Sequence, residues 1–180
     1  MSTFKHSSES HITITELMLP SHSNFSGKIH GGYILSLMDQ VAFACAAKYS
    51  GYYAVTASVD KVDFLQAVEV GELITLKAAV NFVGRSSMVI GIRVESENIK
   101  TGKKKHCNSS FFTMVAKNEE GKTVAVPGLT LNTTDDVRRF VRSAHRQQQG
   151  KIRRGQFKAE TFRIDEHLEL LNSYNIKLTL

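Results

Sequence analysis

The sequence predicts an α+β fold in which one long apolar helix packs against an antiparallel sheet. Residues 31–47 contain a single formal charge and repeat their apolar side chains at helical spacing. The segments that follow are rich in β-branched side chains and are separated by turn residues, which is typical of strands. These strands are not interleaved with further helices, and this order excludes a doubly wound sheet or an α/β barrel.

The elements follow a simple order along the chain. Residues 11–19 alternate as a first strand that Pro20 ends, and residues 21–27 are turn formers leading into the helix. Further strands are predicted at 53–62, 72–83, 86–99, 105–117 and 123–126.

The predicted helix is apolar on most of its surface. One stripe consists of Ile34, Leu37, Met38, Val41, Ala42 and Cys45, and Leu35, Phe43 and Ala46 extend it to the opposite side. We therefore expect the helix to be buried nearly all round, by the sheet on one side and by a second subunit on the other. The sequence thus predicts an obligate homo-oligomer.

Length and composition indicate one domain with an appended tail. The chain has 180 residues, of which 42% are hydrophobic, enough to fill a core. We assign residues 1–131 to the domain and residues 132–180 to a basic, helical C-terminal extension. The net charge is +6, and the extension holds ten Lys and Arg against six Asp and Glu. Such a surface favours anionic partners.

The sequence has no recognisable signal peptide, transmembrane segment or metal-ligand pattern, and these features predict where the protein is located and whether it binds a metal. The polar start has no signal-peptide core, and no apolar stretch is long enough for a transmembrane segment. Cys45 and Cys107 lie in separate apolar segments without metal-ligand spacing, so we expect core residues and no metal site. These features predict a cytoplasmic protein.

The start of the helix combines two groups of chemical interest. His30-Gly31-Gly32 opens it, and backbone N–H groups near Gly31 and Gly32, with the positive end of the helix dipole, can stabilise an oxyanion. Asp39 follows two turns later, where burial would remove its solvation. This layout is suited to acyl-group hydrolysis. An ordinary turn also accounts for a double glycine, and most helical aspartates are exposed or bonded to a neighbour.

Three ordered motifs resemble the hot-dog-fold acyl-CoA thioesterases, close to the brain-type acyl-CoA hydrolases and their bacterial relatives. The first runs from Asn24 through Gly27 and 30–32 to Asp39, the second is 55–60 with Phe64-Leu65 downstream, and the third is 83–88. The resemblance covers roughly residues 11–131. It implies a hot-dog fold, a sheet wrapped around a central helix, and dimers that often assemble into trimers of dimers.

The resemblance also implies roles for individual residues. Asn24 and Asp39 would be the catalytic pair, contributed by different chains, with Asn24 holding the water or the thioester and Asp39 acting as base or nucleophile. His30, Thr56 and Ser58 would bind substrate. His30 could instead act as an acid and base, cap the helix or pack at the dimer seam, and we favour the cap or seam. Thr56 and Ser58, at alternate strand positions and so on one side, could equally satisfy core hydrogen bonds.

Coenzyme A is expected only as part of substrate and product, and no other cofactor is predicted. The turn of Val83, Gly84, Arg85, Ser86 and Ser87 combines backbone donors, a guanidinium and hydroxyls that suit phosphate. As a bare pattern it is more often a hairpin turn, and the resemblance favours coenzyme A binding.

The extension is predicted to begin with a helix after a Thr N-cap near Thr133. Its arginines, Arg138, Arg139, Arg142 and Arg146, surround an apolar stripe. The helix either packs on the oligomer or binds the nucleotide end of coenzyme A or anionic lipid. Two alternatives to hydrolysis remain: a non-catalytic acyl-CoA or nucleotide-binding oligomer, and a nucleic-acid partner, which the lack of an aromatic RNA-binding motif disfavours.

Overall fold

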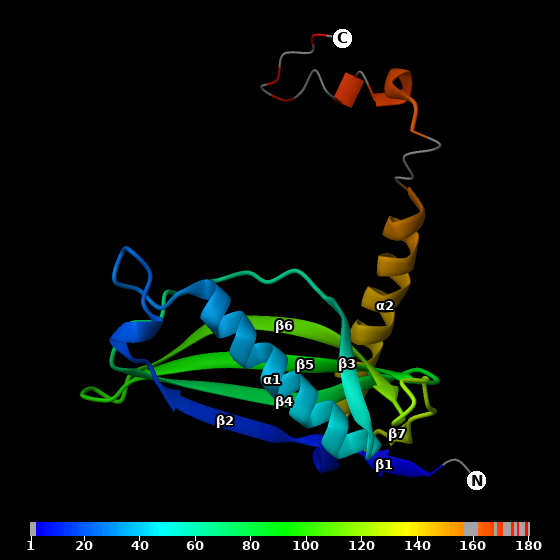
Figure 1. Ribbon diagram of the computed structural model, residues 1–180, viewed down its shortest axis with the longest axis horizontal. Coiled ribbons are helices and arrows are strands. Elements are labelled where there is room, and N and C mark those ends of the chain that lie inside the picture. Colours follow the sequence, from blue (N-terminus) through cyan, green and yellow to red (C-terminus); the bar gives the residue numbers. More distant parts are fainter. Residues whose placement is uncertain are drawn as a thin grey trace. The chain divides into compact units, whose positions relative to one another are not determined.

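A computed structural model describes residues 3–156, 162–167, 169–170, 174, 176 and 179 (Figure 1). Its five-stranded sheet has the order β2 (Ile12–Leu17), β4 (Glu72–Val83), β5 (Ser87–Asn98), β6 (Lys104–Lys117) and β3 (Tyr53–Val59). All neighbouring strands are antiparallel. The predicted α+β class is confirmed, with one long helix on the sheet.

The long helix α1 (Gly31–Ser50) crosses one face of the sheet (Figure 1). Its C-terminus is capped by Gly51, whose φ of 77° is readily adopted only by a residue without a Cβ. The buried stripe of the helix is the predicted one, and it meets the inward side chains of the strands, among them Ile74, Leu76, Ile90 and Met114. This core holds the helix in a fixed rotation about its axis.

The chain ends differ from the prediction. The strand expected at 123–126 is absent, because the amides of Val124 and Val126 donate instead to Ala116 O and Arg85 O at 3.1 and 3.0 Å. A parallel pair forms nearby, between β1 (Phe4–His6) and β7 (Gly128–Thr130). Strands of three residues are too short to show an alternating pattern, so the sequence could not reveal them.

Short helical turns complete the described elements: η1 (Ser7–Ser10), η2 (Pro20–His22) and η4 (Ile164–His167). The helix α2 (Thr134–Gln156) follows the predicted Thr cap, in which Thr133 Oγ accepts from the Asp136 amide at 3.1 Å. Contacts divide the chain into two compact units, Met1–Ser143 and Ala144–Leu180, so α2 spans both. The domain boundary after residue 131 remains a prediction, and much of the extension lies outside the described residues.

Both cysteines are buried and free, as the sequence predicted. Burial raises the pKa of the Cys45 thiol to about 12, so this group stays protonated and unreactive at neutral pH. In the part of the chain that the structure describes, no helix is both long and apolar enough to cross a membrane.

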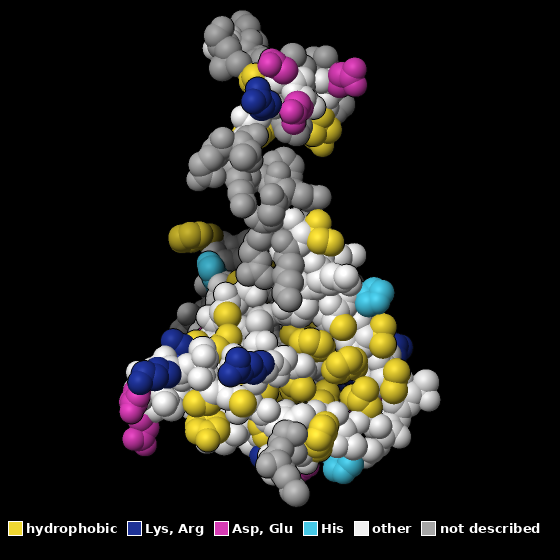
Figure 2. Space-filling model, turned by 90° about the vertical axis from the view of Figure 1, so that its right-hand side faces the viewer, with side chains coloured by type: hydrophobic (Ala, Val, Ile, Leu, Met, Phe, Trp, Pro, Cys, Tyr) yellow, Lys and Arg dark blue, Asp and Glu magenta, His cyan; other side chains and the backbone are white. Residues whose placement is uncertain are grey.

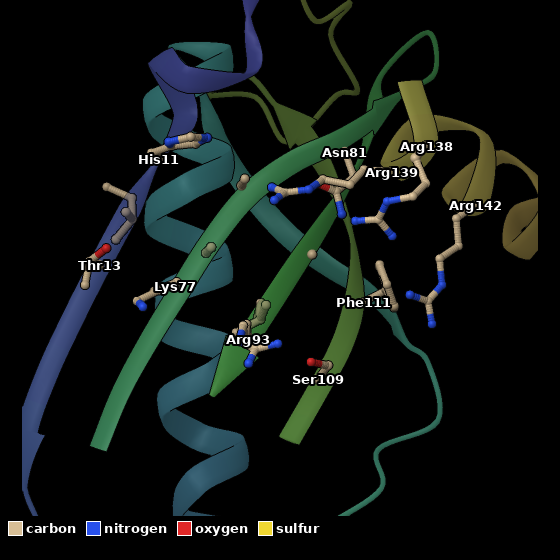
Figure 3. Close-up of a pocket in the computed structure, with 15 residues that line it drawn as sticks. His11, Thr13, Lys77, Asn81, Arg93, Ser109, Phe111, Arg138, Arg139 and Arg142 are labelled. Carbon is tan, nitrogen blue, oxygen red and sulfur yellow. The ribbon is translucent and has the colours of Figure 1, made fainter. Parts of the chain in front are cut away.

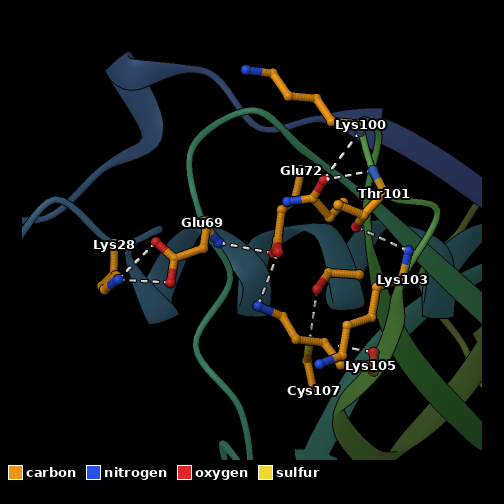
Figure 4. Close-up of polar contacts among 10 residues, drawn as sticks. Lys28, Glu69, Glu72, Lys100, Thr101, Lys103, Lys105 and Cys107 are labelled. Carbon is orange, nitrogen blue, oxygen red and sulfur yellow. Dashed lines mark hydrogen bonds and ion pairs between the residues drawn. The ribbon is translucent and has the colours of Figure 1, made fainter.

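A series of polar contacts fixes the loop before α1 to the sheet (Figure 4). Lys28 binds both carboxylate oxygens of Glu69 at 2.6 and 2.7 Å, and the Glu69 amide donates to the buried Glu72 at 3.0 Å. Lys105 of β6 forms an ion pair with Glu72 at 3.0 Å. Burial by itself would raise the pKa of Glu72, but the bonds from Glu69, Lys105 and Ser96 outweigh it and lower the pKa below the ordinary 4.5.

This lowered pKa predicts how the stability of the fold depends on pH. The Glu72 carboxylate contributes stability that is fully present above pH 4.5 and is lost as the pH falls through its lower folded-state pKa. Glu72→Gln should therefore reduce the free energy of unfolding at pH 7, and its difference from wild type should shrink below pH 4.5. Urea denaturation at several pH values measures this difference.

Glu120→Gln is the matched control, because Glu120 pairs with Lys122 on the surface, where its side chain is 67% exposed. Its difference from wild type should be small at every pH. A pH-independent deficit for Glu72→Gln would contradict the assigned role of the carboxylate.

Candidate active site

The single chain leaves Asp39 exposed, and its burial by a second subunit stays a prediction. The residues of α1 opposite the buried stripe, Ser36, Asp39, Gln40 and Phe43, are exposed. The sequence pattern overestimated burial because Leu35 and Phe43 were counted as core side chains, whereas Leu35 is only half-buried and Phe43 is 38% exposed. Within one chain, this face of α1 is open to solvent.

Asp39 contacts the neighbouring edge strand. Thr56 Oγ donates to Asp39 Oδ1 at 2.5 Å and lies 3.4 Å from the Met114 sulfur. This bond spans the gap between α1 and β3 and fixes one carboxylate oxygen. The other oxygen, Oδ2, has no hydrogen-bond donor within the described residues.

The sequence predicted that Thr56 and Ser58 face the same side of the sheet, and this prediction is wrong. Thr56 pairs with Met114 and Ser58 with the adjacent Thr113, so Ala57 is an extra residue in β3. Such a β-bulge breaks the alternation of a strand. Since directly paired residues share a face, Thr56 lies on the α1 side with buried Met114, and Ser58 lies on the opposite side.

Asn24 organises the loop that precedes α1. Its side-chain Oδ1 accepts hydrogen bonds from the Ser26 amide, the Ser26 hydroxyl and the Lys28 amide at 3.0, 2.8 and 3.1 Å. These bonds fix the carboxamide plane. Within the described residues the Asn24 Nδ2 group has no acceptor, so it is available to a molecule outside this chain.

The two glycines at the start of α1 differ in what their amides can do. His30 caps the helix, as we favoured, and its Nδ1 accepts from the Gly32 amide at 2.9 Å. The Gly32 N–H is therefore occupied, while the Gly31 N–H has no acceptor within the described part of the chain. A Cβ on Gly31 would lie 3.2 Å from the Phe64 ring, so Phe64 packs beside this glycine.

The structure does not bring all the predicted site residues together in one chain. Asp39 is eight residues after Gly31, and at 1.5 Å rise per residue this separates the two by about 12 Å along the helix. A bound carbonyl cannot contact both groups of one chain. Asn24 and the Gly31 amide lie at the start of α1, and Asp39 and Thr56 lie together further along it.

The turn between β4 and β5 contains the predicted phosphate-binding residues. The Gly84 amide donates to Ser87 O at 2.8 Å, and a Cβ on Gly84 would lie 2.7 Å from Ser87 Oγ. Arg85 is exposed, and the Val83 and Ser86 side chains are half-buried. The geometry is that of a tight hairpin, and the Arg85 guanidinium has no bonding partner among the residues that the structure describes.

Two neighbours of this site, Phe64 and Met114, were given no role in it from the sequence, although Phe64 belongs to one of the three motifs. Phe64 is an exposed aromatic in a turn-rich segment, a signal that could have been used, whereas Met114 is indistinguishable from other core residues of β6. Among the described residues, no group of three or more His, Cys, Asp or Glu could hold a metal ion.

This chain is similar in sequence and in structure to members of one protein family. Residues 26–103 match the family model described as "Thioesterase superfamily". "Protein VdlD" of Helicobacter pylori is 41% identical over 129 residues, which are 72% of this chain and 74% of that protein. A structure described as an apo-hexameric acyl-CoA thioesterase superposes with a TM-score of 0.83 and 34% identity, covering 86% of this chain and 99% of that one.

An acyl-CoA hydrolase from Staphylococcus aureus, solved with butyryl coenzyme A, coenzyme A and coenzyme A disulfide, is also similar. Its TM-score is 0.79 at 27% identity, with 94% of this chain and 99% of that chain covered. Variants of it with one asparagine, one aspartate or one threonine replaced by alanine have also been solved. From these matches, this chain belongs to the thioesterase superfamily and has the hot-dog fold of its acyl-CoA thioester hydrolases.

Proposed function

We propose that this protein hydrolyses acyl-CoA thioesters to a free acid and coenzyme A, in active sites that two chains build together. The observation that carries the proposal is the position of Asp39, bonded to Thr56 on the uncovered face of α1. The family relationship supports the reaction class. In the Staphylococcus aureus hydrolase the substituted asparagine, aspartate and threonine have the same sequence spacing as Asn24, Asp39 and Thr56.

A second copy of the chain would cover the exposed face of α1 that carries Asp39. Among the described strands, β3 pairs with β6 alone, so its other edge is open. Large hydrophobic side chains beside it are exposed: Phe43, Tyr52, Tyr53 and Val59. Figure 2 shows that hydrophobic side chains are also exposed on the face of the domain that forms the right-hand side of Figure 1. An open edge beside apolar surface favours pairing with another chain.

In such a dimer, α1 of one chain would bring its N-terminal groups to Asp39 of the other. The sheets would join along β3, and dimers would assemble as trimers of dimers, in line with similar proteins described as hexameric. Each two-fold dimer would then hold two equivalent sites.

The chemistry follows from these groups. Asp39 removes a proton from a water molecule oriented by Asn24, the hydroxide adds to the thioester carbonyl, and the Gly31 N–H of the facing chain stabilises the oxyanion. The C–S bond then breaks, and the thiolate of coenzyme A takes the proton from Asp39. In the alternative route, Asp39 itself attacks the carbonyl carbon, and the C–S bond breaks to release coenzyme A as its thiolate. Water then hydrolyses the resulting anhydride, which frees the acid and the Asp39 carboxylate, and the proton released goes to the thiolate.

The remaining predicted residues would surround the substrate. Thr56 would hold one oxygen of Asp39 so that the other faces the reaction. Arg85, with the Gly84, Ser86 and Ser87 groups of the turn, would bind a phosphate of coenzyme A, and Val83 would pack beside it. His30 would border the substrate while capping the helix. Ser58 lies on the opposite side of β3 from Thr56, so we do not assign it to this site.

Replacing either member of the catalytic pair tests the proposal. Asp39→Asn and Asn24→Ala should each lower kcat for an acyl-CoA substrate by about 10²–10³ or more, because a base or a positioned polar partner is lost. A panel of acyl-CoA chain lengths, followed by thiol release, gives the rates. Isothermal titration with coenzyme A should show binding retained. Wild-type hydrolysis by both variants would refute the assignment, and binding without hydrolysis by the wild type would indicate a non-catalytic acyl-CoA-binding oligomer.

Thr56 provides a finer test of how Asp39 is positioned. Thr56→Val keeps the shape but removes the hydrogen bond to Asp39, and we expect kcat to fall by about 10- to 100-fold, since a bond to a charged group contributes about 1.5–3 kcal/mol. Thr56→Ser restores the hydroxyl and should retain most activity.

Both Thr56 variants should unfold at similar denaturant concentrations, which separates positioning from folding. A Thr56→Val enzyme with wild-type kcat would show that the bond to Asp39 has no part in catalysis.

A further inference from the structure

A pocket lies on the face of the sheet opposite α1. It has a volume of about 400 Å³ and is lined by residues of β2, β4, β5 and β6 and by the first turns of α2 (Figure 3). Phe140 of α2 contacts Phe82 of β4 at a ring-centroid distance of 5.1 Å, which holds these turns beside the sheet. All lining residues belong to the same compact unit, Met1–Ser143.

The lining of this pocket is strongly cationic. Its described lining residues include no Asp or Glu but five cations: Lys77, Arg93, Arg138, Arg139 and Arg142. Two nearby carboxylates neutralise part of this charge. Glu95 pairs with Lys77 and Arg93 at 2.7 and 2.8 Å, and these bonds lower the pKa of Glu95 to about 2. Asp135 pairs with Arg138 and Arg139 at 2.5 and 2.6 Å.

Arg142 differs from the other four cations because no carboxylate pairs with it in the described part of the chain. Its guanidinium lies over the Phe111 ring, 5.5 Å from the ring centroid. This cation–π contact does not use the N–H donors of the guanidinium, and none of them has an acceptor within the described residues. Figure 3 shows Arg138, Arg139 and Arg142 reaching from α2 toward the strands that carry Asn81 and Phe111.

Asn81 supplies a second, independent observation. It is the extra residue of a β-bulge in β4, since Val80 pairs with Ile90 and Phe82 with Val89. The bulge turns the Asn81 side chain over Gly91, where a Cβ would lie 2.0 Å from Asn81 Nδ2. Asn81 is only 7% exposed and lines the pocket, and its carboxamide, which has no hydrogen-bond partner within the described residues, keeps contact with solvent there. Its Nδ2 group is a donor that a ligand in the pocket can use.

We propose that this pocket binds a small polyanionic ligand carrying a pyrophosphate or two neighbouring phosphate groups. Arg142 and the other cations would bind the phosphate oxygens, and Asn81 Nδ2 would donate to one of them. Its volume is in the range of small-molecule sites. The ligand is either the nucleotide end of coenzyme A or a free phosphorylated metabolite. The existence of this binding site does not depend on the proposed hydrolysis. Its assignment to the nucleotide end of coenzyme A does rest on that proposed function.

Calorimetric titration of the full-length protein with inorganic pyrophosphate tests the site without any need for catalysis. Wild type should bind, and binding should weaken as salt is raised, because the attraction is electrostatic. Arg142→Ala should weaken binding at least about tenfold, as expected for the loss of charge-assisted hydrogen bonds. Gly91→Ala should also weaken binding, since the new methyl group displaces Asn81.

Lys122→Ala is the control, because Lys122 is a surface cation whose side chain is 76% exposed and lies outside the residues that line this pocket. It should leave the pyrophosphate affinity unchanged. No saturable binding to wild type, or binding unaffected by Arg142→Ala, would overturn the proposal.

Two further titrations identify the source of the ligand. If the nucleotide end of coenzyme A occupies the pocket, Arg142→Ala should weaken coenzyme A binding and leave pantetheine binding unchanged. If a free metabolite occupies it, Arg142→Ala should lose ADP and pyrophosphate binding while the affinity for coenzyme A stays at the wild-type value.

Discussion

The packing of the apolar stripe of α1 against the inner face of the sheet is the constraint on which the rest of the structure depends. Met38 is fully buried in this contact, and the neighbouring Asp39 is consequently turned to the open side of the helix. The same rotation brings Asp39 beside Thr56 of the edge strand. The chemistry we propose therefore takes place on the face of α1 that the core does not use.

Two β-bulges have comparable consequences on the two faces of the sheet. The bulge at Ala57 leaves Thr56 on the α1 side beside Asp39 and directs Ser58 to the other side. The bulge at Asn81 points the carboxamide of this residue toward the cationic pocket on the opposite face. Bulges commonly re-aim single side chains in this way. The sheet thus presents one surface suited to a thioester and another suited to phosphate.

Much of the fold could be predicted because long elements carry strong patterns. The stripe of α1 and the four longest strands are regular over many residues, and the predicted strand at 72–83 coincides with β4. Exposure of Asp39 could not be predicted, because a pattern of apolar residues does not distinguish burial by the sheet from burial by another chain. The bulge at Ala57 was also hidden, since an extra residue leaves a strand's composition unchanged. The arginines of α2 were noted, but not the sheet face that they join.

The central claim is that Asn24 and Asp39 act across a subunit boundary, and complementation between inactive variants tests it most directly. In a mixed dimer of Asp39→Asn and Asn24→Ala chains, one of the two shared sites keeps both native residues. Random mixing by unfolding and refolding the two variants together should therefore recover about a quarter of wild-type activity, while each variant alone stays inactive. If each site lies within one chain, every site carries a substitution, and the absence of any recovery in confirmed mixed dimers would contradict the account.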